Sequence, residues 1–271
     1  ILSVLSKAYS VIPTNDRIGV ARVLADLDLS DPRYPVDLDS WHNELARCNE
    51  VFGQPVGYWC YVQPDVYRIG GWDQSEGVDI TLTAFWIARF PITVAQYALF
   101  AEVGYRQAAK GWWTPKGWKG KGDRISPNAW HQSPFDGANQ PVIGVTWYEA
   151  TAFCAWLTEQ LRDALPSGYV VRLPSEAEWE TAAAYDANGQ RWLYPWGNDE
   201  PTPERAIYDA SQIRHPVPIG CCPAGAATCG ALDLAGNVWE WMASSYGGYP
   251  AKSAIVVEDF KASEGFTPNE F

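Results

Sequence analysis

The most informative stretch of this sequence is Gly236-Asn237-Val238-Trp239-Glu240-Trp241. It follows residues 230–235, in which apolar and polar side chains interleave, and two tryptophans flank its single carboxylate. An acid held between large aromatic side chains needs a cation or a hydrogen-bond partner, because burying an unpaired charge is costly. The alternative is an amphipathic core strand in which Glu240 faces water.

Four further stretches accompany this one, and all five resemble, in order, the motifs of one protein family. This is the formylglycine-generating-enzyme-like (sulfatase-modifying-factor) family, a branch of the C-type-lectin fold. The resemblance runs from roughly residue 57 to residue 243, and five motifs in order are far more specific than one. The other four are Phe85-Trp86-Ile87-Ala88-Arg89-Phe90-Pro91-Ile92-Thr93, Pro141-Val142-Ile143-Gly144-Val145-Thr146-Trp147, Arg172-Leu173-Pro174-Ser175-Glu176-Ala177-Glu178-Trp179-Glu180 and Tyr194-Pro195-Trp196-Gly197-Asn198.

Composition limits the classes of partner. The 271 residues carry a formal net charge of −12, which argues against nucleic acid, whose binding requires neutralisation of phosphates. No apolar run is long enough to span a bilayer, so we expect no membrane partner. The chain starts at Ile1 and lacks a signal-peptide pattern, and we interpret it as an excised piece of a longer protein. We expect a monomer.

The six cysteines are scattered and match neither a disulfide framework nor a zinc pattern. Cys154 lies in an apolar helical stretch and is interpreted as a core residue. Cys222 and Cys229 are spaced so that a disulfide across their loop is an open alternative, since spacing alone decides little. This cysteine usage favours a cytoplasmic location.

Helical spacing of Leu and Val predicts two short helices in residues 1–30, separated by a break at residues 12–16. Another short helix is predicted for residues 41–50. We interpret residues 1–50 as a helical appendage or the tail of an upstream domain. The resemblance implies that residues 51–271 form a formylglycine-generating-enzyme-like domain that lacks the family's C-terminal end.

Strands and capped helices then predict an α+β domain. Short β-like runs occupy residues 58–62, 66–69 and 85–87. Thr93, Thr146 and Ser175 each precede a Gln or Glu by three residues, the pattern of a capping box that opens a helix. Strands and helices do not alternate regularly, which excludes a doubly wound parallel sheet.

Residues 111–122 are predicted to be a basic, aromatic loop, and Trp112, Trp113 and Trp118 make it a candidate ligand-binding surface. The alternative is that these tryptophans pack over the core, as large aromatic residues mostly do.

The chemistry that the resemblance implies is incomplete in this chain. Formylglycine-generating oxidases bind copper through two cysteines downstream of the motif at residues 236–241, which we call the central motif. No cysteine follows Cys229 in this chain. A sibling branch holds non-haem iron with closely spaced histidines, whereas His42, His131 and His215 are far apart. We therefore predict no catalytic residues.

The resemblance implies a structural Ca²⁺ ion at the central motif instead. Its ligands would be Asp233, the Gly236 and Val238 carbonyls, and the Glu240 carboxylate, an oxygen set that suits calcium. The family's second calcium site begins with an asparagine, which is absent from the matching residues 206–209.

These observations favour a non-catalytic domain of C-type-lectin fold that binds a protein or small-molecule ligand. The resemblance extends to the variable proteins of diversity-generating retroelements, which use this fold as a hypervariable binding face. One alternative is a formylglycine-generating oxidase whose catalytic cysteines lie outside this chain. Another is a sensor module of a larger regulatory protein.

Overall fold

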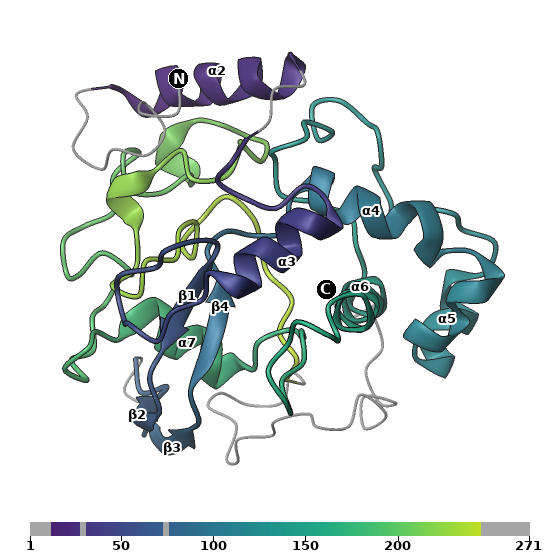
Figure 1. Ribbon diagram of the computed structural model, residues 1–271. Coiled ribbons are helices and arrows are strands. Elements are labelled where there is room, and N and C mark those ends of the chain that lie inside the picture. The colour runs from purple at the N-terminus through teal and green to yellow at the C-terminus, as the bar shows by residue number, and fades with distance from the viewer. Residues whose placement is uncertain (1–11, 28–30, 73–75, 245–271) are drawn as a thin grey trace.

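The computed structural model describes residues 12–27, 31–72 and 76–244 (Figure 1). In these residues no helix is both long and apolar enough to cross a membrane. The helices are α2 (Thr14–Asp26), α3 (Leu38–Ala46), α4 (Val94–Gly104), α5 (Pro115–Lys121), α6 (Trp147–Gln160) and α7 (Glu176–Ala184), with short 3-10 helices η1 (Gln107–Trp112), η2 (Asp209–Ser211) and η3 (Pro223–Gly225).

The strands form two antiparallel pairs. Strand β1 (Trp59–Val62) pairs with β4 (Phe85–Ala88), and β2 (Asp65–Ile69) pairs with β3 (Val78–Leu82). Burial alternates along β1, where Cys60 and Val62 face inward, because successive side chains of a strand point to opposite faces. The runs predicted at residues 58–62, 66–69 and 85–87 are confirmed, and so is the α+β class.

Capping boxes open the three central helices as predicted. The Thr93, Thr146 and Ser175 side chains each accept a hydrogen bond from the backbone N–H three residues later. The return bonds run from each of these residues' own N–H to Gln96, Glu149 and Glu178. In each case the side chains satisfy backbone groups that the helix start would otherwise leave unpaired.

The N-terminal helices pack on the rest of the chain. Trp41 of α3 is fully buried, and its ring lies edge-on to Tyr58, 5.3 Å away between centroids. Helix α2, at the top of Figure 1, packs Ile18, Ala21 and Leu24 in one cluster with Ile207, Val217, Cys221 and Cys222. It begins inside the break predicted at residues 12–16, and the helix predicted before that break lies outside the described residues. The domain boundary at residue 50 stays a prediction.

Residues 115–121 are helical rather than part of a loop, because Thr114 accepts a bond from the Gly117 N–H and Pro115 occupies the first turn. The three tryptophans of this region pack against the main hydrophobic cluster, as the alternative interpretation expected. Trp113 is buried and donates to the Gly104 carbonyl at 2.7 Å, whereas Trp112 donates to Glu159 at 2.9 Å.

The central motif forms a turn, not a strand. Gly236 has a φ of 83°, and a Cβ placed on it would lie 2.2 Å from the Ile207 carbonyl oxygen. Residue 236 also forms a parallel bridge with Ile207, so the two segments cannot move apart freely. Only glycine combines this backbone angle with such a close approach.

We predict that Gly236→Ala destabilises the protein by about 3 kcal/mol, because left-handed strain of about 1 kcal/mol adds to a backbone clash. Gly189→Ala is the matched control, since Gly189 has a φ of 75° with nothing within 4 Å of its Cβ position. Gly189→Ala should lower the free energy of unfolding only by the strain of the left-handed backbone, about 1 kcal/mol. Urea unfolding measures the stability of both variants. Equal losses of stability would show that the close contact with Ile207 does not contribute.

Candidate functional site

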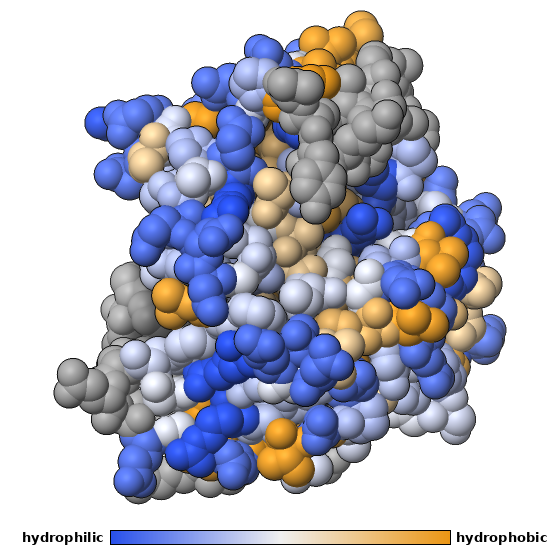
Figure 2. Space-filling view, turned by 90° about the vertical axis from the view of Figure 1, so that its left-hand side faces the viewer, coloured by the Kyte–Doolittle hydropathy of each residue, from blue (hydrophilic) through white to orange (hydrophobic). Residues whose placement is uncertain are grey.

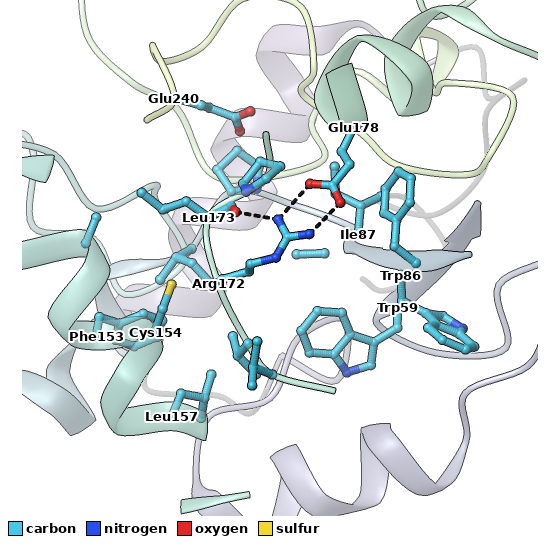
Figure 3. Close-up of a pocket in the computed structure, with 18 of the residues that line it drawn as sticks. Trp59, Trp86, Ile87, Phe153, Cys154, Leu157, Arg172, Leu173, Glu178 and Glu240 are labelled. Atoms are coloured by element: carbon cyan, nitrogen blue, oxygen red, sulfur yellow. Dashed lines mark hydrogen bonds and ion pairs between the residues drawn. The ribbon is translucent and has the colours of Figure 1, made fainter. Parts of the chain in front are cut away.

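A cavity of about 700 Å³ lies between β1, β4 and α3 on one side and α6, α7 and residues 232–241 on the other. Figure 3 shows Trp59 and Trp86 on the strand side, and Phe153, Cys154 and Leu157 of α6 opposite them. Its walls are mainly aromatic. The aromatic lining residues are Trp41, Trp59, Phe85, Trp86, Phe90, Tyr97, Phe153, Tyr169, Trp179, Trp239 and Trp241.

An ion pair closes one wall of the cavity (Figure 3). The Arg172 guanidinium donates to both oxygens of Glu178, at 2.7 and 2.5 Å, and also to the Leu173 carbonyl at 3.0 Å. Glu178 belongs to the capping box of α7 and accepts the Ser175 N–H at 2.8 Å. One carboxylate thus fixes both the start of α7 and the segment that precedes it.

The ion pair shifts the titration of both partners. Burial alone would raise the pKa of Glu178, but hydrogen bonds and charge from Arg172 outweigh it and hold that pKa below its usual value. The hydrogen bonds to Glu178 likewise raise the pKa of Arg172. A lowered carboxyl pKa stabilises the fold above the unfolded pKa, near 4.3, and this contribution disappears as pH falls through the folded pKa.

We predict that Arg172→Met costs about 2–3 kcal/mol at pH 7, because it leaves Glu178 charged and only 7% exposed without its partner. This penalty should shrink as pH falls, because a buried Glu178 carboxyl without its partner protonates more readily than one held by Arg172. Urea unfolding between pH 3.5 and 7 measures it. Arg106→Met is the control at an exposed arginine, and the same loss in both variants would contradict a role for the ion pair.

Glu240 is the second acid of the cavity, and its surroundings differ from those expected. Trp239 is fully exposed, and Trp241 donates to the Val145 carbonyl at 2.9 Å, so the two tryptophans do not enclose the carboxylate. Instead, Glu240 is half-buried and accepts the Trp179 Nε1–H. Burial raises the pKa of Glu240 to about 7, the Trp179 bond lowers it, and the nearby Asp233 charge raises it further.

Asp233 is buried, and its charge acts on Glu240. It accepts the Gly220 N–H at 2.7 Å. Burial raises the pKa of Asp233 to about 6, opposed by the Gly220 bond and the Arg33 charge. The Asp233 charge thus disfavours ionisation of Glu240, whereas the Arg33 charge favours ionisation of Asp233.

The backbone around the predicted calcium ligands makes hydrogen bonds of its own. The Gly236 carbonyl accepts the Val238 N–H at 2.8 Å, which already occupies one of its lone pairs. The described residues contain no group of three or more His, Cys, Asp or Glu side chains able to hold a metal. Backbone oxygens would have to complete such a site, so the calcium site stays a prediction.

Asn237 holds the central turn in place and was missed by sequence reasoning. Its side chain forms two bonds with Val217, accepting the N–H at 2.9 Å and donating to the carbonyl at 3.2 Å. Its backbone N–H bonds the Ile207 carbonyl at 2.8 Å. Asn237 has a left-handed φ of 64°, which asparagine tolerates, and the Gly-Asn pair was the turn signal available in the sequence.

Two indole donors of the cavity lack partners. The Nε1 atoms of Trp41 and Trp59 are buried and form no hydrogen bond with other described groups. Both residues line the cavity, and their rings lie 5.9 Å apart between centroids. Buried polar groups are nearly always satisfied, so two unpaired N–H groups set this wall of the cavity apart.

Cys154 also lines the cavity, but it is a core residue, as expected. Burial raises the pKa of its thiol to about 12, although Arg172 lowers it, so the thiol is protonated at neutral pH. The six cysteines are not cross-linked. Cys229 donates to the Ala182 carbonyl at 3.3 Å and packs in one cluster with Cys60, and it is not paired with Cys222.

The other predicted binding residues are not part of this cavity. Trp112, Trp113 and Trp118 line neither it nor the smaller cavity beside α3. Figure 2 shows another face of the molecule, on which hydrophobic residues form separate patches among hydrophilic ones. A ligand-binding role for the three tryptophans stays a prediction.

Comparison with known proteins identifies the family. A model of the "Sulfatase-modifying factor enzyme 1-like domain" matches residues 66–265. A hercynine oxygenase of Mycolicibacterium thermoresistibile is 34% identical over 197 residues, which are 67% of this chain and 40% of that protein. A formylglycine-generating enzyme of Mycobacterium tuberculosis is 28% identical over 218 residues, covering 63% of this chain and 66% of the relative.

Among solved structures, Treponema denticola variable protein 1 is similar at 20% identity, with a TM-score of 0.47 and coverage of 68% of this chain and 71% of that one.

The fold and the site together describe an α+β domain built around an aromatic cavity. The chain belongs to the formylglycine-generating-enzyme-like, sulfatase-modifying-factor family and has its C-type-lectin-like fold. The family match extends to residue 265, beyond the last motif recognised in the sequence. The chain spans less than half the length of the hercynine oxygenases that it matches.

Proposed function

We propose that this domain binds a small zwitterionic ligand in the aromatic cavity without carrying the residues that transform it. The observation behind this proposal is the combination of groups in the cavity. Glu240 is an acid that forms no ion pair among the described residues, and the Trp41 and Trp59 indole N–H groups are donors without acceptors. A ligand with a cationic group and a carboxylate complements both.

Aromatic walls suit an organic cation in particular. A quaternary or protonated amine is attracted to the faces of tryptophan and tyrosine rings, by about 0.5–2 kcal/mol per contact. The cavity's other charged side chains, Arg172 and Glu178, neutralise each other, so Glu240 sets the net charge of the lining. An acidic site in a chain of net charge −12 favours a positively charged group.

The similarity to hercynine oxygenases supplies a specific probe. Hercynine is an N-trimethylated histidine and has the charge pattern that the cavity favours. We include it in the proposed ligand class, together with related betaines.

Calorimetric titration of the chain with hercynine tests this proposal. We predict saturable binding that Glu240→Gln weakens at least tenfold, because a desolvated charge contact contributes about 1.5–3 kcal/mol. Glu200→Gln, at an exposed acid, is the control and should bind like the parent. The absence of binding, or equal binding by both variants, would refute the proposal.

A second candidate is that the domain is the substrate-binding half of an enzyme related to hercynine oxygenases. It is favoured by 34% identity to proteins of which the chain covers only 40–42%. Both candidates require ligand binding, and they differ in turnover by the longer protein. The oxidase alternative, in which the catalytic cysteines lie outside this chain, stays a hypothesis. Three expectations from the sequence remain hypotheses: that a retroelement diversifies the domain, that it is a sensor module, and that it is cytoplasmic.

The structural calcium ion is also a proposal. Glu240 and Asp233 would contribute carboxylate oxygens, and Gly236 and Val238 their carbonyls. We predict that Ca²⁺ raises the melting temperature and EDTA lowers it, since an ion at a hundredfold excess over its Kd adds about 2.7 kcal/mol. The response should be lost in Glu240→Gln and kept in Glu200→Gln. An unchanged midpoint on chelation would mean that hydrogen bonds alone hold Glu240.

A further inference from the structure

A second cavity of about 330 Å³ lies beside the C-terminal end of α3, apart from the aromatic cavity's acids. It reaches the surface at Arg47 and Val56, which are about half exposed. Its walls combine apolar residues with three arginines and one acid. They are Pro32, Arg33, Glu44, Arg47, Val56, Gly57, Tyr58, Arg89, Phe90, Gly220, Pro223, Ala226 and Leu232.

Two of these arginines are already neutralised. Arg33 forms a bidentate ion pair with Asp31, at 2.9 and 2.6 Å, and donates to the Ile219 carbonyl at 2.9 Å. Arg47 pairs with Glu44 at 2.7 Å and donates to the Val56 carbonyl at 2.8 Å. Neither guanidinium needs a further anion.

Arg89 is the third arginine, and it differs from the other two. Among the described residues no carboxylate lies within ion-pair distance of it, and its Nε is buried without a hydrogen-bond partner. The nearby Cys60 thiol does not replace a carboxylate. A hydrogen bond with Cys229, together with burial, raises the pKa of Cys60 well above its usual value, so it is neutral at pH 7.

Backbone hydrogen bonds hold Arg89 in place at the wall of the second cavity. Its N–H donates to the Tyr58 carbonyl and its carbonyl accepts the Leu232 N–H, both at 2.8 Å. These bonds continue the β1–β4 ladder by one residue and join it to the 232 segment. The backbone from which the Arg89 side chain extends is therefore held in place at the cavity wall. Arg89 is half-buried and has no carboxylate beside it among the described residues, so its guanidinium is available to a ligand anion.

We propose that this second cavity binds a small organic carboxylate through the Arg89 guanidinium. A carboxylate matches the planar fork of arginine, and its single negative charge balances the single unneutralised positive charge of the lining. A phosphate dianion would add excess negative charge next to Glu44 and Asp31. Phe90, Leu232 and Pro223 provide an apolar surface for the rest of the acid.

Titration with benzoate, followed by ¹⁵N NMR of the arginine Nε–H groups, tests the site. Benzoate should bind with saturation and shift the Arg89 signal, whereas neutral benzamide of the same shape should bind at least tenfold more weakly, since a charged hydrogen-bond pair contributes about 1.5–3 kcal/mol. Inorganic phosphate should bind more weakly than benzoate.

Arg89→Met should lower benzoate affinity at least tenfold, and Arg106→Met, at an exposed arginine, should leave it unchanged. If Arg89→Met does not fold, the Arg89 signal of the unmodified chain still decides. Equal affinity for benzoate and benzamide, tighter binding of phosphate, or no response of the Arg89 signal to saturating benzoate would each overturn the proposal.

Discussion

The half-buried ion pair between Arg172 and Glu178 is the constraint on which the aromatic cavity depends. Glu178 receives two bonds from Arg172 and one from the Ser175 N–H, so its charge is satisfied away from bulk water. Removing one partner of such a pair leaves a buried charge, which is more harmful than never having the pair. Because both charges are committed to each other, the cavity keeps an acid, Glu240, for other partners.

The turn at residues 233–241 completes the cavity from the opposite side. Gly236 passes close to Ile207, and Asn237 joins the same turn to Val217, which places Trp241 against Val145 and leaves Glu240 at the cavity. The motif that characterises the family is therefore chiefly a device for bringing distant loops together. Its acid is held by one indole donor, and its first tryptophan faces solvent.

Local signals in the sequence predicted most of the helices and strands, because caps such as Thr146 with Glu149 act over three residues. The family and the α+β class followed from motif order. The cavity was not predictable, since its acids and unpaired indoles come from segments far apart in the chain. The Cys60–Cys229 contact and the isolation of Arg89 also depend on long-range packing. The two tryptophans beside Glu240 led to a wrong expectation of its surroundings, because neighbouring side chains in a turn can point in different directions.

The central claim is that the aromatic cavity binds a cationic ligand beside Glu240. Fluorine NMR of the chain labelled with 5-fluorotryptophan tests it most directly, with hercynine as the added ligand and each signal assigned by substitution. We expect saturable shifts of the signals of Trp59 and Trp86, which line the cavity, and no shift of the signal of Trp113, which is buried elsewhere. Unshifted Trp59 and Trp86 signals at saturating hercynine, or shifts confined to other tryptophans, would contradict it.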